Sequence, residues 1–358
     1  MPEEISALSY LTTVNLRNNS LTGELPPTLT TLAKLTQLDL SENKFSSTLP
    51  FNIGRLEKLS VLILGRNDFV GSIPQTISLL HQLKELDLSR TSLSGPILGA
   101  SPGPGSQFQN QGAPWINLKY LEHLDLSRCQ FTGTIPTHIV SLSSLIDFRA
   151  EENLLTGSIP LEQILSSQIN LTSLTLFSNT LSGTIPSNIT HPLSLRVLDL
   201  SFNNMESSLP ESIGTFLPSL EVLNLARNSI SGTLPPRLGM MSDLIQLNLQ
   251  INYLQGEIPS ELSNCTSLTL IDLGQNHLVG QIPSSIGKLT GLEQLHLGFN
   301  QLGGSLPSEL GNLQKLSSLR LPNNDFTGSI PLSFLNMSSL GKLYAMAGKP
   351  SFFHLANV

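Results

Sequence analysis

The stretch Leu35-Thr-Gln-Leu38-Asp-Leu40-Ser-Glu-Asn43-Lys-Phe45 decides the fold, because it returns with the same spacing as Leu59-Ser-Val-Leu62-Ile-Leu64-Gly-Arg-Asn67-Asp-Phe69. The shared frame, L-x-x-L-x-L-x-x-N-x-L, recurs along the 358 residues as thirteen units. The asparagine position repeats every 24 residues, except for steps of 38, 26 and 25. Thr91 and Cys129 replace the asparagine in two units. Such self-similarity is the signature of a repeat architecture.

Each position of the frame has a physical role. The x-L-x-L-x segment alternates leucine with mostly polar residues, which indicates a short strand with one buried face. One such strand cannot bury its leucines alone, so stacked units are expected to pair in parallel and form a continuous core. The asparagine amide has donors and an acceptor for the turn that follows the strand, and its repetition predicts an asparagine ladder. This accounts for the 72 leucines of the chain.

The second half of each unit contains glycine and proline in the order G-x-I/L-P, as in Gly71-Ser-Ile73-Pro74 and Gly256-Glu-Ile258-Pro259. Proline lacks a backbone donor and fixes φ, so long helices are not expected there. We predict extended or 3-10 segments on the convex side and a parallel sheet on the concave side. The predicted fold class is therefore α/β, a right-handed solenoid of repeats.

The L-x-G-x-I-P segment resembles the plant-specific class of leucine-rich repeats over about residues 10–335. The resemblance implies a twisted solenoid of the kind found in ectodomains of receptor-like kinases and receptor-like proteins, and in polygalacturonase inhibitors. It also implies an extracellular or cell-surface location. The family usually has paired cysteines in caps at both ends, whereas this chain has only Cys129 and Cys265.

We expect residues 1–358 to form a single solenoid whose core spans 10–335. Residues 98–115 are rich in glycine and proline and are predicted to form an inserted surface loop with a possible partner contact through Phe108 or Trp115. Residues 340–358 begin another unit but lose the pattern. Pro2 falls in the proline segment of an incomplete unit, so we expect a fragment of a longer receptor, whose kinase domain would lie outside this chain.

Composition excludes several classes of function. A net charge of −7 disfavours a nucleic-acid-binding surface. No apolar run approaches the length of a membrane span, so direct membrane insertion is not expected. The seven histidines have no metal-ligand spacing, and the cysteines are interpreted as small buried residues. We expect no cofactor and no enzymatic activity.

The slot just before the asparagine varies most, and it points to two candidate surfaces on the concave face. The first is a basic strip of three consecutive units, Arg66, Arg90 and Arg128. Stacked arginines are suited to hold a carboxylate or sulfate. The alternative is that these arginines pair with Asp87 and Asp125, which lie three residues earlier in their units.

The second surface is apolar and is our preferred ligand face. Its members are expected to face solvent, and aromatic side chains beside an arginine are typical of interface hot spots. The alternative is that these side chains only pack against neighbouring strands. Replacing both Phe202 and Arg227 with alanine is expected to weaken partner binding by at least ~10-fold with the fold intact. The candidate residues are Phe177, Phe202, Arg227, Ile251, His296 and Phe299.

We predict a non-catalytic recognition module that binds a peptide, a glycan fragment or a protein, with a co-receptor kinase as a further partner. The alternatives are a secreted inhibitor of a polygalacturonase-type enzyme and a truncated, non-functional receptor fragment. Five N-x-S/T sequons permit glycosylation, although chance accounts for about that number. They begin at Asn18, Asn170, Asn188, Asn264 and Asn336.

Overall fold

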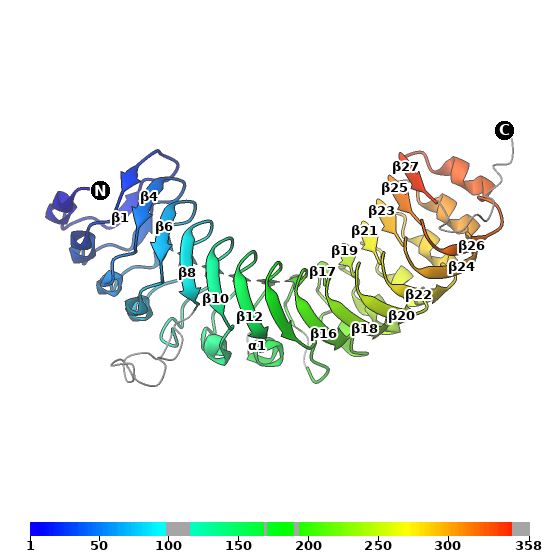
Figure 1. The fold of residues 1–358 in the computed structure, drawn as a ribbon, viewed down its shortest axis with the longest axis horizontal. Coiled ribbons are helices and arrows are strands. Elements are labelled where there is room, and N and C mark those ends of the chain that lie inside the picture. The colour runs from blue at the N-terminus through cyan, green and yellow to red at the C-terminus, as the bar shows by residue number, and fades with distance from the viewer. Residues whose placement is uncertain (98–114, 168–169, 190–192, 346–358) are drawn as a thin grey trace. The chain divides into compact units, whose positions relative to one another are not determined.

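The structure is a computed structural model that describes residues 1–97, 115–167, 170–189 and 193–345. The chain divides into two compact units, Met1–Ser182 and Gly183–Val358. Within each unit the strands of successive repeats lie side by side in two sheets (Figure 1). The predicted leucine-rich solenoid with parallel strands and 3-10 segments is confirmed. The prediction that residues 1–358 form one domain stays a prediction.

The inner sheet of the first unit is built from three-residue strands at the centre of the leucine frame. In Gln37–Asp39 the middle residue Leu38 is buried, while its neighbours face away from the core. Leu38 pairs with Leu62 of the next repeat, so identical positions stack in register. The strands are β1 (Thr13–Asn15), β3 (Gln37–Asp39), β5 (Val61–Ile63), β7 (Glu85–Asp87), β9 (His123–Asp125), β11 (Asp147–Arg149) and β13 (Ser173–Thr175).

The glycine segments form a second parallel sheet, which the sequence predicted only as extended chain. The glycine of each segment has a positive φ, for example 82° at Gly71, where Thr48 of the preceding repeat approaches closely. Ser47 takes this conformation with φ 76° in a repeat that lacks the glycine. The strands are β2 (Thr22–Gly23), β4 (Lys44–Ser47), β6 (Asp68–Gly71), β8 (Ser92–Pro96), β10 (Gln130–Gly133), β12 (Leu154–Ser158) and β14 (Thr180–Gly183).

The convex segments are short helices that mostly follow a proline. Pro74 has φ −61° and ψ 133° and stands immediately before a 3-10 helix, in the extended conformation that ends the preceding segment. The first unit contains η1 (Glu3–Ala7), η2 (Pro27–Thr31), η3 (Ile53–Arg55), η4 (Gln75–Leu79), η5 (Thr137–Ser141) and the α-helix α1 (Leu161–Ser167).

The second unit repeats the same pattern. Its inner strands are β15 (Val197–Asp199), β17 (Val222–Asn224), β19 (Gln246–Asn248), β21 (Leu270–Asp272), β23 (Gln294–His296), β25 (Ser318–Arg320) and β27 (Lys342–Tyr344). Its second sheet contains β16 (Asn204–Ser208), β18 (Ser229–Thr233), β20 (Tyr253–Gly256), β22 (His277–Gly280), β24 (Gln301–Ser305) and β26 (Asp325–Thr327). Its helices are α2 (Ile213–Phe216), η6 (Pro236–Met240), η7 (Ser260–Asn264), η8 (Ser284–Lys288), η9 (Ser308–Asn312) and η10 (Leu332–Asn336).

The predicted asparagine ladder is present. Asn67 Nδ2 donates to the carbonyl of Leu64 in its own repeat and to that of Leu40 in the preceding one, both at 2.9 Å. Its Oδ1 accepts the backbone N–H of Phe45 at 2.9 Å. Asn67 therefore satisfies buried backbone groups in two neighbouring repeats, which would otherwise cost free energy.

The two cysteines are free thiols in different environments. Cys129 fills an asparagine slot, where its Sγ lies 3.3 Å from the Leu88 carbonyl and 3.3 Å from Thr91 Oγ1. Cys265 is fully buried, and burial raises the pKa of its thiol to about 11. Burial also raises the pKa of the Cys129 thiol. Both thiols are therefore protonated and unreactive at neutral pH.

Most of the predicted insertion, residues 98–114 with Phe108, lies outside the described residues. Trp115 is described and is only 2% exposed, so the alternative of a partner contact through Trp115 is wrong. Residues 346–358 of the predicted degenerate unit also lie outside the described residues. Its first part does form a strand, β27, which pairs with β25.

Candidate ligand-binding surface

The variable slot before each asparagine has a left-handed backbone conformation in both units, a feature that the sequence pattern does not predict. The φ values of these residues lie between 53° and 60°, a region that costs side-chain-bearing residues about 1–2 kcal/mol. Hydrogen bonds hold the conformation; Arg66 N–H, for example, donates to the Ser89 carbonyl at 2.8 Å. We call these residues the left-handed column: Asn18, Glu42, Arg66, Arg90, Arg128, Glu152, Ser178, Phe202, Arg227, Ile251, Gln275, Phe299 and Asn323.

In the second unit the left-handed column carries exposed aromatic and apolar side chains. Phe202 is 48% exposed and Phe299 is 52% exposed, as the sequence predicted. The Arg227 guanidinium lies 5.0 Å from the Phe202 ring centroid, a cation–π contact. Ile251 is half-buried in the next repeat. We call Phe202, Arg227, Ile251 and Phe299 the aromatic strip.

His296 does not face solvent, contrary to the prediction, and is only 9% exposed. Its Nδ1 lies 3.2 Å from Asp272 Oδ2 and its Nε2 lies 3.1 Å from Ser318 Oγ. Both ring nitrogens are thus occupied by side chains of the neighbouring strands, so the imidazole lies between them. The order Asp–His–Ser is that of a hydrolase triad, but Ser318 is only 6% exposed, which closes its hydroxyl to a substrate.

Phe177 belongs to the first unit and is half-buried, so it presents less surface than Phe202 or Phe299. It lies one residue before the left-handed column rather than in it. Of the predicted apolar surface, the aromatic strip therefore belongs to the second unit, and Phe177 is a single side chain of the first unit.

The arginines of the basic strip are exposed, but their partners are not the predicted ones. Arg66 lies 3.6 Å from Glu42 and Arg128 lies 2.8 Å from Glu152. These glutamates occupy the same slot one repeat away. The predicted pairing with Asp87 or Asp125 is not formed, because neither carboxylate lies within 4.0 Å of a nitrogen of Arg66, Arg90 or Arg128. Each of these aspartates accepts the backbone N–H two residues later, from Ser89 at 2.8 Å and from Ser127 at 2.9 Å.

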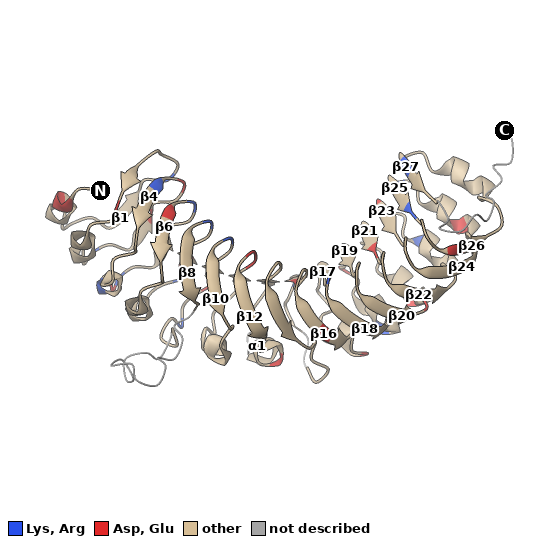
Figure 2. Ribbon diagram, in the orientation of Figure 1, with Lys and Arg blue, Asp and Glu red and all other residues tan. Residues whose placement is uncertain are grey.

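The basic strip borders a cavity of about 340 Å³ on the inner face of the first unit. Ten of its fifteen lining residues are charged. Figure 2 shows acidic and basic positions of this unit along the inner strands and the turns that follow them. We call this cavity the charged groove; its charged residues are Arg17, Glu42, Arg66, Glu85, Asp87, Arg90, Asp125, Arg128, Arg149 and Glu151.

Two acidic side chains that line the charged groove, Asp87 and Glu151, have raised pKa values. Burial raises the pKa of Asp87, and the nearby carboxylates of Asp125 and Glu85 raise it further. Burial also raises the pKa of Glu151, again with a contribution from Asp125. These carboxylates are therefore less stable in the ionised form than free ones, and a cation placed among them would be favoured.

The leucine-rich repeat family model matches nine segments: residues 10–32, 34–56, 120–142, 170–192, 194–216, 219–241, 267–289, 291–313 and 315–337. Together these cover more than half of the chain. The chain belongs to the leucine-rich repeat family. No curated protein matches it.

Several solved structures are similar to this leucine-rich repeat chain over nearly its whole length. PEPR1 with AtPEP1 is 37% identical with a TM-score of 0.86, over 96% of this chain and 46% of that one. The ectodomain of the Arabidopsis receptor kinase HAESA with an IDA peptide hormone is 34% identical with a TM-score of 0.87, over 97% and 56%. HAESA with IDA and the co-receptor SERK1 is 31% identical with a TM-score of 0.82, over 96% and 59%. The chain thus spans about half the length of the chains in these solved structures.

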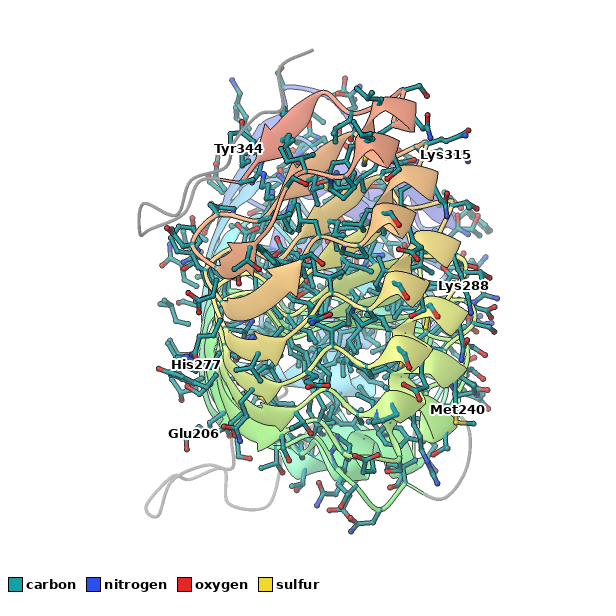
Figure 3. All side chains as sticks on the ribbon, turned by 90° about the vertical axis from the view of Figure 1, so that its right-hand side faces the viewer. Glu206, Met240, His277, Lys288, Lys315 and Tyr344 are labelled. Carbon is teal, nitrogen blue, oxygen red and sulfur yellow. The ribbon has the colours of Figure 1, made fainter. Side chains whose placement is uncertain are left out.

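The flanks of the second leucine-rich repeat unit differ from its inner face. Figure 3 shows Glu206 and His277 on the side of the second sheet. Met240, Lys288 and Lys315 lie on the opposite side, beside the short helices. The second-sheet flank has a different aromatic contact, in which the exposed Tyr253 ring stacks on His277 with the ring centroids 6.1 Å apart.

All five sequon asparagines are exposed, so none is closed to a glycan by burial: Asn18, Asn170, Asn188, Asn264 and Asn336. Within the described ranges, no group of three or more His, Cys, Asp and Glu side chains is placed to hold a metal ion. The described helices also include none that combines the length and apolarity of a membrane span.

Proposed function

We propose that this chain is a non-catalytic recognition region of a plant cell-surface receptor, and that it binds an extended peptide along the aromatic strip of the second unit. The observation that carries the proposal is the exposed Phe202 ring with Arg227 against it. Its position in the left-handed column supports the proposal, because the backbone there is fixed by hydrogen bonds to the next repeat, such as that from Phe202 N–H to the Ala226 carbonyl at 2.8 Å.

The chemistry of the strip fits a peptide. An exposed phenylalanine beside an arginine offers apolar area and a charged donor within one small region, which is the composition of interface hot spots. Repeated strands place successive column residues about 4.8 Å apart. The seven inner strands of the second unit therefore match about nine residues of extended peptide.

The comparisons support the same class of ligand and partner. The similar PEPR1 and HAESA structures contain AtPEP1 and the peptide hormone IDA, and one HAESA structure contains the co-receptor SERK1. By analogy we propose an extracellular location, a peptide as first ligand and a co-receptor kinase as second partner. Glycans on the exposed sequon asparagines belong to the same proposal.

The test is a selection of displayed random peptides of about nine residues on the purified chain. Selected peptides are then measured by calorimetry against wild type and against the double variant Phe202→Ser with Arg227→Gln. Ser178 and Gln275 already occupy the same left-handed slot, so both replacements suit the backbone. We expect the double variant to lose about tenfold or more in affinity.

A matched control replaces residues of the same type on the convex side, Phe51→Ser with Arg237→Gln. Phe51 is 76% exposed and Arg237 lies in η6. This control is expected to bind like wild type. Equal affinity of the wild type and the strip variant, or a selection without specific binders, would contradict the proposed function.

A further inference from the structure

The charged groove of the first unit contains one arginine without a protein partner. Arg66 and Arg128 are each paired with a glutamate, as described above. Arg90 lies between them in the left-handed column, is exposed, and has no carboxylate of the described residues within 4.0 Å. Of the three arginines in the basic strip, the middle one is therefore available to an external anion.

The lining of the same groove also contains two carboxylates that have no cationic partner among the described residues, Asp87 and Asp125. Asp87 and Asp125 are direct register partners on β7 and β9, so the two residues stand on neighbouring strands whose backbones lie about 4.8 Å apart. Each uses Oδ1 to accept one backbone N–H. Among the described residues, neither carboxylate has a lysine, arginine or histidine nitrogen within 4.0 Å.

We propose that the charged groove binds a peptide segment with adjacent basic and acidic side chains, the basic one placed between Asp87 and Asp125 and the acidic one on Arg90. This proposal rests on the proposed peptide-binding function and assigns a second contact region to it. A guanidinium has donors on several sides, so one placed between aspartates of neighbouring strands donates to an oxygen of each. A carboxylate forms a two-bond pair with the Arg90 guanidinium.

The geometry of an extended peptide explains why the two side chains are adjacent in sequence. Successive side chains of an extended chain point to opposite sides of its backbone. For a peptide that crosses the inner strands, one side faces the row of Asp87 and Asp125, and the other faces the row of Arg90. Adjacent residues of the peptide therefore reach opposite rows.

The same arrangement argues against sulfate, which the sequence predicted as one ligand of the arginines, and against a polyanion in general. The lining of the groove has five arginines and five acidic residues, so its formal charge is balanced. A polyanion on Arg90 would lie near the unpaired carboxylates of Asp87 and Asp125. Their repulsion offsets the attraction of the arginine.

The test uses synthetic peptides of equal length with Gly-Ser flanks: one with Arg-Glu pairs, one with only glutamate and one with only arginine at those positions. Binding to the full chain is measured by calorimetry at low salt, because exposed charge pairs are screened by salt. Sodium sulfate and calcium chloride serve as small-ion probes. We expect the mixed peptide to bind about tenfold more tightly than either single-charge peptide.

Arg90→Gln and Asp125→Asn are each expected to weaken binding of the mixed peptide about three- to tenfold. Both variants preserve the fold, because Gln275 occupies the column slot and Asn224 occupies the aspartate slot of other repeats. Arg90→Glu is expected to prefer the arginine peptide. Arg55→Gln on η3 and Asp68→Asn on β6 change residues that do not line the groove, and these matched controls are expected to leave binding unchanged.

Three results would overturn the proposal: no binding of the mixed peptide at about 1 mM, a glutamate peptide or small ion that binds as well, or an unchanged affinity of Arg90→Gln. The double variant Phe202→Ser with Arg227→Gln separates a failure of the charged groove to bind the mixed peptide from a failure of the aromatic strip to bind its own peptides. It changes only the second unit and is expected to leave the mixed peptide's affinity unchanged.

Discussion

The two units have the same repeating backbone but carry different side chains on their inner faces. In the first unit the inner face is charged and contains a groove with balanced acidic and basic residues. In the second unit the same slots hold Phe202, Ile251 and Phe299. The ladder differs as well, since Thr91 and Cys129 interrupt it only in the first unit. Recognition chemistry and fold are therefore encoded by separate positions of the repeat.

The largest expected effect comes from breaking the complete ladder of the second unit. Asn252 bonds to the Leu225 and Leu249 carbonyls and accepts Ile230 N–H at 2.8 Å. Asn252→Ala leaves these buried groups unsatisfied and is expected to cost about 3 kcal/mol. Thr91→Ala loses the 2.9 Å bond to the Leu88 carbonyl and two longer contacts, with Leu93 N–H at 3.4 Å and Cys129 Sγ at 3.3 Å, and is expected to cost only about 1 kcal/mol. Hydrogen exchange of the neighbouring amides measures both, and equal losses would contradict the comparison.

A smaller effect of opposite sign is expected at Ile251. A β-branched residue is poorly suited to a φ of 54°, whereas Asn18 and Asn323 occupy the same slot. Ile251→Asn is expected to raise the free energy of unfolding by about 1 kcal/mol in urea denaturation. Ile245→Asn is the control, because Ile245 is also partly exposed but has no positive φ. A stabilisation of the control by the same amount would show that strain is not the cause.

The smallest expected effect is the change in unfolding free energy when the strand aspartate of each unit, Asp87 or Asp199, is replaced with asparagine. The pKa of Asp87 is raised in the folded state. The folded protein therefore loses stability relative to the unfolded chain as pH rises from the ordinary pKa through the raised one, because the aspartate ionises less readily when folded. Asp87→Asn is expected to stabilise by up to about 0.5 kcal/mol at pH 7. The gain should vanish below pH 3.8, the ordinary value, where the aspartate is protonated in both states.

Asp199→Asn in the second unit is the matched variant and should have the opposite sign. Asp199 accepts hydrogen bonds from Ser201 and from Asn224 Nδ2 at 2.9 Å, and no second carboxylate lies in the neighbouring repeat's slot. Neutralising it weakens these bonds. Urea denaturation of both variants across pH checks the pair, and the same sign for both would contradict this account.

The sequence predicted the repeat, the inner strands and the ladder because each follows from a local pattern of leucine, asparagine and proline. The left-handed column was not predicted, since Phe202, Ile251 and Arg90 are residue types that do not favour a positive φ, as glycine does.

The side-chain pairs were not predicted for a different reason. Arg66 meets Glu42, and His296 meets Asp272, across 24 residues of sequence. Comparing each slot with the same slot one repeat away would have found both pairs.

The left-handed column also has an evolutionary consequence. Every member has nearly the same φ whether its side chain is arginine, phenylalanine or asparagine. A substitution in one repeat therefore changes one contact with a ligand and leaves the other repeats in place. Gene copies of such a protein can diverge in ligand preference through single codon changes, each of which natural selection tests separately from the stability of the whole chain.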